Sequence, residues 1–119
     1  YGGYSLGGLA AISSLYSSDK MSLIFSICGS FWYPKFVDYC KAHQFINKTC
    51  SVYLRNGLTE GANHKNRLSK APSYAKEVHE CIKKQCLSTY SAFDPYGHHN
   101  NLQERYDAFS DWLIEEWKL

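Results

Sequence analysis

Three side chains in this sequence have the chemistry to form and break an acyl bond: a serine, an acid and a histidine. Ser5 stands in the pattern Gly3-x-Ser5-x-Gly7, which is typical of a tight strand-to-helix turn that exposes a nucleophilic serine. A serine hydroxyl is a weak nucleophile at neutral pH, so a histidine must take its proton and later return it. A carboxylate then holds the imidazole in one tautomer. His98 and Glu60 are the candidates for these two roles.

The same turn offers a donor for the negative charge that develops on an attacked carbonyl oxygen. The backbone N–H of Leu6 would lie at the amino end of the helix that follows Ser5, where unpaired N–H groups and the helix dipole favour an anion. We expect the second donor to come from an earlier strand–helix loop, which this chain does not contain.

The elements that position these residues follow from hydrophobic spacing. Helical periods and strand-length apolar runs alternate along the chain. The helices are expected at residues 6–16, 36–43, 69–85 and 102–117, and the strands at residues 21–28, 50–54 and 89–93. This alternation predicts an α/β fold with a parallel sheet covered by helices on both faces.

In such a sheet the loops that follow the strands gather at one edge, where ligands bind. Glu60 follows the strand at 50–54, and His98 follows the strand at 89–93. Ser5 should follow a first strand, but only four residues precede it. We therefore expect the strand that enters the turn to be largely missing. Because all three loops share one edge, we also expect the three side chains to meet at the carboxyl edge of the sheet.

The order serine, acid, histidine is that of the α/β-hydrolase arrangement and differs from other serine-hydrolase orders. The segments YGGYSLGGLAA, CGSFWYP and GHHNNLQERYDAFSDWL resemble three parts of one esterase family of α/β hydrolases: the nucleophile turn, an aromatic loop, and the histidine loop with its terminal helix. That family includes siderophore trilactone esterases, S-formylglutathione hydrolases and related small carboxylesterases. The resemblance spans nearly all 119 residues.

The resemblance implies that residues 1–119 form a single partial domain without a linker. It corresponds to the carboxyl-terminal half of an α/β-hydrolase fold, which has three layers and a mostly parallel sheet. It implies Ser5 as the nucleophile and His98 as the base. The acid is expected about three residues after the glycine that closes the preceding strand, which is Glu60 when counted from Gly57. Asp94, in the histidine's own loop, is the alternative acid, although a turn-capping role suits it better.

Other residues have candidate roles in substrate binding. Phe31 and Trp32 could line a pocket for the acyl or alcohol group, or they could be core aromatics. His99 is the alternative base to His98 and otherwise a residue of the pocket rim. Cys81 and Cys86 do not share a helix face well, so we expect no metal site there. A serine hydrolase of this kind also needs no organic cofactor, and none is expected.

Composition limits the class of protein further. A net charge of +2 with scattered basic residues does not suit a nucleic-acid partner. Five cysteines among apolar residues favour reduced, buried thiols and a cytoplasmic protein. No apolar run is long enough to span a membrane.

These observations predict a serine hydrolase that cleaves a small carboxylic ester or thioester through an acyl-enzyme intermediate. An acyltransferase with the same three residues is one alternative. The other is a non-catalytic structural or interaction fragment that self-associates as a homo-oligomer through an exposed sheet edge. The identity of the ester is left open.

Overall fold

The computed structural model describes residues 1–62, 64, 66–98 and 101–117. Four strands and four α-helices alternate along the chain, with a short 3₁₀ turn after the first helix and another before the third. The elements are β1 (Gly2–Tyr4), α1 (Leu6–Ser13), η1 (Ser14–Tyr16), β2 (Leu23–Ile27), α2 (Phe36–Ala42), β3 (Ser51–Gly57), η2 (Arg67–Lys70), α3 (Ala71–Gln85), β4 (Thr89–Asp94) and α4 (Leu102–Trp117). The predicted α/β fold class is confirmed.

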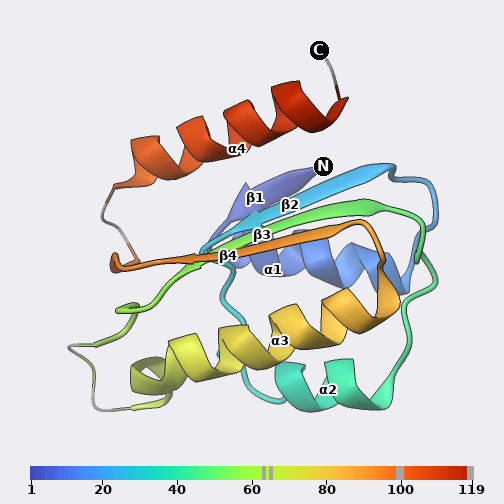
Figure 1. The fold of residues 1–119 in the computed structure, drawn as a ribbon. Coiled ribbons are helices and arrows are strands. Elements are labelled where there is room, and N and C mark those ends of the chain that lie inside the picture. Colours follow the sequence, from blue (N-terminus) through green and yellow to red (C-terminus); the bar gives the residue numbers. More distant parts are fainter. Residues whose placement is uncertain (63, 65, 99–100, 118–119) are drawn as a thin grey trace.

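The four strands form one parallel sheet in the order β1-β2-β3-β4. Figure 1 shows three layers: α1, α2 and α3 lie on one face of the sheet, and α4 lies alone on the other. The first three helices connect consecutive strands, and because such crossovers are right-handed, strands added in one direction place their helices on one face. All strands point the same way, so the loops after them share one edge.

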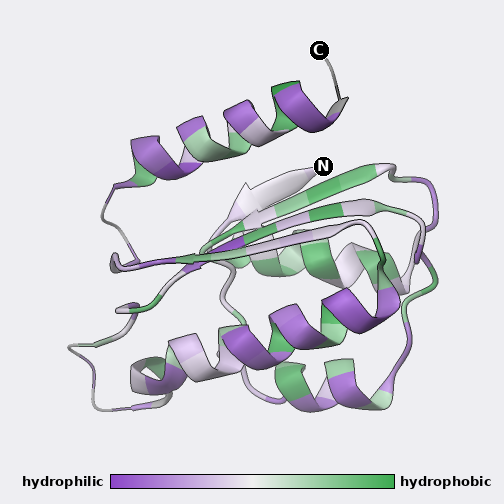
Figure 2. Ribbon diagram, in the orientation of Figure 1, coloured by the Kyte–Doolittle hydropathy of each residue, from purple (hydrophilic) through white to green (hydrophobic). Residues whose placement is uncertain are grey.

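Successive side chains of the central strands point to opposite faces and build two cores. Ile24, Val52 and Leu54 pack with the apolar residues of α1, α2 and α3. The neighbouring residues Ile27 and Tyr53 pack under α4 instead. In Figure 2 the hydrophobic colours run along β2, β3 and α1, while α3 and α4 alternate between hydrophobic and hydrophilic colours, as amphipathic helices do.

A short strand enters the turn at Ser5, so part of the strand that was expected to be largely missing is present. β1 is only three residues long, but all of them pair with β2, from Gly2 opposite Phe25 to Tyr4 opposite Ile27. The backbone pairing continues past the strand, because Ser5 N–H donates to the Ile27 carbonyl over 3.0 Å. The sequence Gly-Gly-Tyr has none of the β-branched residues that signal a strand, so its pairing was not visible from the sequence.

β3 also runs further than expected, to Gly57 rather than residue 54. Its last residues pair with β4, with Asn56 opposite Phe93 and Gly57 opposite Asp94. All five cysteines lie among the described residues, and all are free thiols; four are buried and Cys81 is half-buried. No helix within the described ranges is both long and apolar enough to cross a membrane.

Candidate active site

Ser5 sits in a backbone conformation that few residues adopt. Its φ of 62° and ψ of −120° lie outside the backbone regions that are sterically favoured for a residue with a side chain. Hydrogen bonds hold it there: its N–H is bound to β2, and its carbonyl accepts from Leu9 N–H and Ser30 N–H, both at 3.1 Å. The turn therefore directs the Ser5 hydroxyl away from the sheet and over the carboxyl edge.

Ser5, His98 and Glu60 form a continuous line of hydrogen bonds, which we call the triad line. Ser5 Oγ lies 3.0 Å from His98 Nε2, and His98 Nδ1 lies 2.6 Å from Glu60 Oε1. A carboxylate can only accept, so Nδ1–H donates to Glu60, and in the tautomer with its proton on Nδ1 the Nε2 atom accepts from the Ser5 hydroxyl. The structure thus brings together the three residues that the sequence singled out.

The carboxylate of Glu60 is only 4% exposed, yet its oxygens are well supplied with donors. Oε2 accepts from Gly57 N–H at 2.8 Å and from Asn56 Nδ2 at 3.2 Å, while Oε1 accepts from His98. These three N–H donors hold the carboxyl group in one orientation, with Oε1 facing His98. Glu60 is therefore suited to stabilise an imidazolium at His98.

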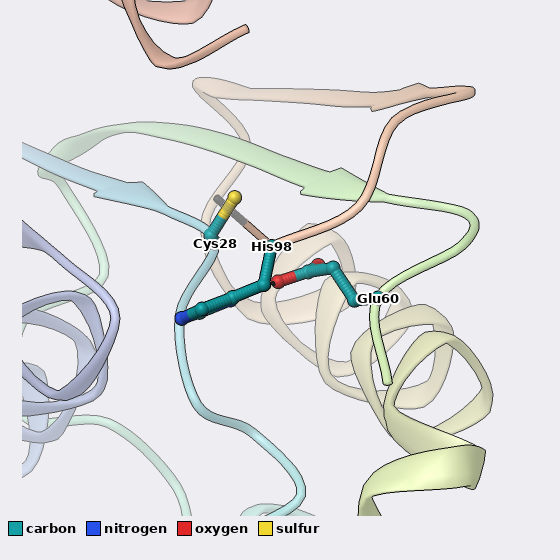
Figure 3. Close-up of side chains that lie close together, drawn as sticks. All are labelled: Cys28, Glu60 and His98. Atoms are coloured by element: carbon teal, nitrogen blue, oxygen red, sulfur yellow. Dashed lines mark hydrogen bonds and ion pairs between the residues drawn. The ribbon is translucent and has the colours of Figure 1, made fainter. Parts of the chain in front are cut away.

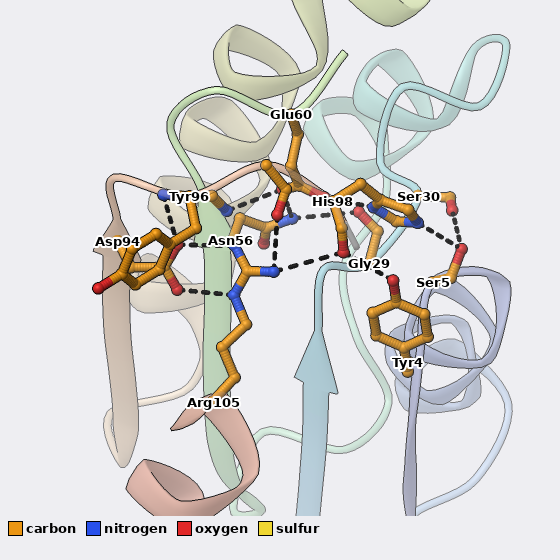
Figure 4. A network of polar contacts seen from close by, with 12 residues as sticks. Tyr4, Ser5, Gly29, Ser30, Asn56, Glu60, Asp94, Tyr96, His98 and Arg105 are labelled. Atoms are coloured by element: carbon orange, nitrogen blue, oxygen red, sulfur yellow. Dashed lines mark hydrogen bonds and ion pairs between the residues drawn. The ribbon is translucent and has the colours of Figure 1, made fainter. Parts of the chain in front are cut away.

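Asp94, the alternative acid, is engaged elsewhere. It accepts two hydrogen bonds from Arg105, from Nε at 2.7 Å and from Nη2 at 2.6 Å, and it caps the turn through Tyr96 N–H at 3.1 Å. Figure 4 shows Asp94 and Arg105 beside the triad line, with Glu60 facing His98. The geometry places Glu60, and not Asp94, on the histidine.

The backbone around His98 is held from two sides. Arg105, on α4, donates through Nη1 to the carbonyls of Gly97 and His98, at 2.8 and 3.3 Å. Tyr4, on β1, donates its hydroxyl to the His98 carbonyl at 2.6 Å and stacks on the imidazole with ring centroids 5.2 Å apart. Burial raises the pKa of Tyr4, so its hydroxyl stays a donor. The loop that carries His98 is thereby tied to both β1 and α4.

A pocket of about 200 Å³ opens at the Ser5 end of the triad line. Its lining residues are Ser5, Ser30, Trp32, Glu60, Gly61, His64, Leu68, Ala71 and His98. Trp32 is thus a wall of the pocket. Phe31 is instead 1% exposed and stacks on Phe36 in the core, with ring centroids 5.8 Å apart. Pocket lining and core packing were both considered for these aromatics. The structure fits pocket lining for Trp32 and core packing for Phe31.

Leu6 and His99 are the two remaining residues that the sequence predicted for the site. Leu6 begins α1 directly after Ser5, so its N–H has no carbonyl one turn earlier in the helix. His99 lies outside the described residues. Ser30, which the sequence did not single out, places its hydroxyl 3.3 Å from Ser5 Oγ.

Cys28, Glu60 and His98 also form a group whose potential metal-ligating atoms lie within 4.8 Å of one another. Figure 3 shows the thiol beside the paired imidazole and carboxylate. Two of these three atoms are already hydrogen bonded to each other, and burial together with the Glu60 charge raises the pKa of the Cys28 thiol. Because the histidine and the carboxylate already pair with each other, the arrangement fits a triad with a buried thiol beside it.

Sequence reasoning missed Asn56, Arg105 and Tyr4. Asn56 directly precedes the glycine that ends β3, and Tyr4 directly precedes Ser5, so both positions had a local signal. Arg105 had none, because its partner Asp94 is eleven residues away and only the fold brings it under the loop.

No family model matches this chain, and comparisons with curated proteins and with solved structures found no match either. What the site does must therefore be inferred from its own geometry.

Proposed function

We propose that this chain carries the catalytic residues of a serine hydrolase that cleaves a small carboxylic ester or thioester. The observation that carries the proposal is the triad line, with Ser5 Oγ 3.0 Å from His98 Nε2 and His98 Nδ1 2.6 Å from Glu60 Oε1. The strained backbone of Ser5 supports it, because strain of this kind persists where the surroundings maintain it for function. The parallel sheet with its site at the carboxyl edge suits half of an α/β-hydrolase fold.

In this proposal Ser5 Oγ attacks the carbonyl carbon of the ester while its proton passes to His98 Nε2. Glu60 stabilises the imidazolium and keeps its own charge. The Leu6 N–H donates to the oxyanion. The carbon–oxygen or carbon–sulfur bond then breaks, His98 returns the proton to the leaving alcohol or thiol, and Ser5 remains acylated. Water attacks the acyl carbon by the same route, releasing the acid and the free serine.

The decisive experiment is labelling of the purified chain with a fluorophosphonate probe, together with hydrolysis of short p-nitrophenyl esters. We expect wild type to be labelled and Ser5→Ala to be neither labelled nor active, because no other hydroxyl lies so close to His98 Nε2 among the described contacts. Removal of a triad nucleophile costs about 10⁶-fold in kcat.

Ser30→Ala is the matched control, since Ser30 is the other hydroxyl within reach of Ser5. It should still be labelled, which identifies Ser5 as the modified residue. Full hydrolysis by Ser5→Ala would contradict the proposal. Product analysis with competing alcohols then separates hydrolysis from acyl transfer.

A further inference from the structure

A second line of hydrogen bonds runs behind the triad line and ends on Glu60. Asn56 Nδ2 donates to Glu60 Oε2 and to the Gly29 carbonyl, each at 3.2 Å. Asn56 Oδ1 lies 2.8 Å from His79 Nε2, and His79 Nδ1 lies 2.8 Å from Ser91 Oγ. The line thus joins the end of β3 to α3 and β4, and of its members only Glu60 lines the pocket.

The direction of every hydrogen bond in this second line is determined. The Asn56 amide faces two acceptors on one side, a carboxylate and a carbonyl, so its NH₂ group must point there and its oxygen must point to His79. His79 is 1% exposed, and burial, with a smaller effect from Lys83, lowers its pKa to about 3. The ring is neutral, so Nε2–H donates to Asn56 and Nδ1 accepts from the Ser91 hydroxyl.

The ring of His79 is held in this orientation by packing as well. It stacks on Phe93 with ring centroids 4.4 Å apart, and the edge of Phe31 meets it at 6.2 Å. Neither His79 nor Asn56 lines the pocket. Asn56 therefore contacts the site through the Glu60 carboxylate and through the Gly29 carbonyl, and of these two partners only Glu60 is hydrogen bonded to His98.

We infer that Asn56 is the positioning residue of the acid, and that His79 sets the orientation of the Asn56 amide. This inference rests on the proposed function, in which Glu60 supports His98. Without the Asn56 donor, Oε2 loses one of its two N–H donors and keeps that of Gly57, so the carboxyl group is less firmly held toward His98. His79 prevents the Asn56 amide from flipping, because its Nε2–H needs the amide oxygen as its acceptor. A flipped amide would turn that oxygen toward the Glu60 carboxylate.

The test compares Asn56→Ala with Asn47→Ala. Asn47 is a matched control because it is also 1% exposed and also uses both ends of its amide, donating to the Met21 carbonyl and accepting from Cys50 N–H. Neither of these partners touches the triad line. Both variants lose a buried amide, but only one should affect His98.

For Asn56→Ala we expect kcat to fall about ten- to a hundredfold with little change in KM, the size of a lost hydrogen bond to a charged group. The acid limb of the kcat/KM profile should move to lower pH, because a displaced Glu60 stabilises the imidazolium less. The ionisable groups that face His98 are Glu60, Tyr4, Cys28 and Arg105, and both variants retain all four. Asn47→Ala should leave kcat and the limb unchanged.

Two substitutions of His79 extend the test and cover the case in which Asn56→Ala does not fold. His79→Phe keeps the stacking on Phe93 but removes the donor to Asn56, so it should shift the limb in the same direction. His79→Gln can still donate to Asn56 through its amide, so it should keep the acid limb of the kcat/KM profile at the wild-type pH. An unchanged limb and kcat in both Asn56→Ala and His79→Phe would overturn the inference.

A second readout separates this inference from the proposed function. The titration of His98 is followed by NMR in histidine-labelled chain, which needs no substrate. A lower His98 pKa in Asn56→Ala but not in Asn47→Ala supports the positioning role even if wild type hydrolyses no ester. Normal hydrolysis by wild type with identical His98 titrations in all variants would leave the proposed function standing and refute the role of Asn56.

Discussion

At the scale of single residues, the site depends on how closely the backbone of β1 approaches the backbone of α1. A Cβ added to Gly3 would lie 2.5 Å from the carbonyl carbon of Gly7, closer than real side chains come. A Cβ added to Gly7 would meet nothing within 4 Å. The two glycines of the Gly-x-Ser-x-Gly pattern therefore have different roles. Gly3 must lack a side chain, because the backbone of Gly7 lies where its Cβ would be.

This difference predicts opposite effects for the same substitution. Gly3→Ala should lower the free energy of unfolding by about 1 to 3 kcal/mol, the usual cost of overpacking. Gly7→Ala should leave it unchanged or raise it by up to about 1 kcal/mol, because alanine is the better helix former. Urea unfolding of both variants measures this directly. Equal losses at both positions would mean that the close approach is not what the pattern requires.

At the scale of elements, α4 does more than cover one face of the sheet. Its apolar residues pack over Tyr53 and Ile27, while Arg105 reaches past the core to Asp94 and to the loop carbonyls before His98. Gly57 permits this, since a Cβ there would lie 2.4 Å from Arg105 Nη2. The docking of one helix thus determines where the histidine loop lies.

Arg105→Ala should therefore cost both stability and activity. Arg105 is 1% exposed, and its removal leaves the buried Asp94 carboxylate with the Tyr96 N–H and the more distant guanidinium of Arg55, whose Nη1 lies 3.9 Å away. Breaking a buried ion pair in this way costs about 3 to 5 kcal/mol of unfolding free energy. Thermal or urea unfolding provides the measurement, and the ester assay reports on the loop.

The control for this prediction is Lys41→Ala, which removes an exposed ion pair with Glu77 and should have no measurable effect. The double variant Arg105→Ala with Asp94→Ala should recover part of the lost stability, since the stranded charge is then gone as well. No recovery in the double variant would mean that Arg105 acts through packing alone.

At the scale of the whole molecule, the fold was largely predictable, because continuous apolar runs and helical periods directly reflect burial on a parallel sheet. The meeting of Ser5, Glu60 and His98 followed from strand order. The sequence could not reveal why β3 continues through Arg55 and Asn56, which look like turn residues. Asn56 tolerates burial there only because His79 and Glu60 satisfy its amide, and these partners are brought to it by tertiary structure.

The burial of His79 has a consequence for the stability of the entire chain. Its pKa is lowered by burial from the ordinary 6.5 to about 3 in the folded state, whereas the unfolded chain exposes it. As the pH falls below 6.5, the unfolded state binds a proton that the folded state does not, so stability must fall. The contribution is intact above pH 6.5 and is lost progressively down to about pH 3.

We therefore expect the free energy of unfolding to fall by about 2 kcal/mol between pH 6.5 and pH 5 from this histidine alone, at about 1.4 kcal/mol per pH unit. This window lies above the range in which ordinary carboxyl groups titrate. Urea unfolding at several pH values gives the slope for wild type and for His79→Gln, whose amide cannot take up the proton, so its curve should be flatter by that amount. Asn47→Ala, which loses a buried polar side chain but keeps His79, should be less stable at every pH with the wild-type slope. Parallel curves for wild type and His79→Gln would mean that His79 is accessible to protons in the folded protein, and that the ring is not held neutral behind the site.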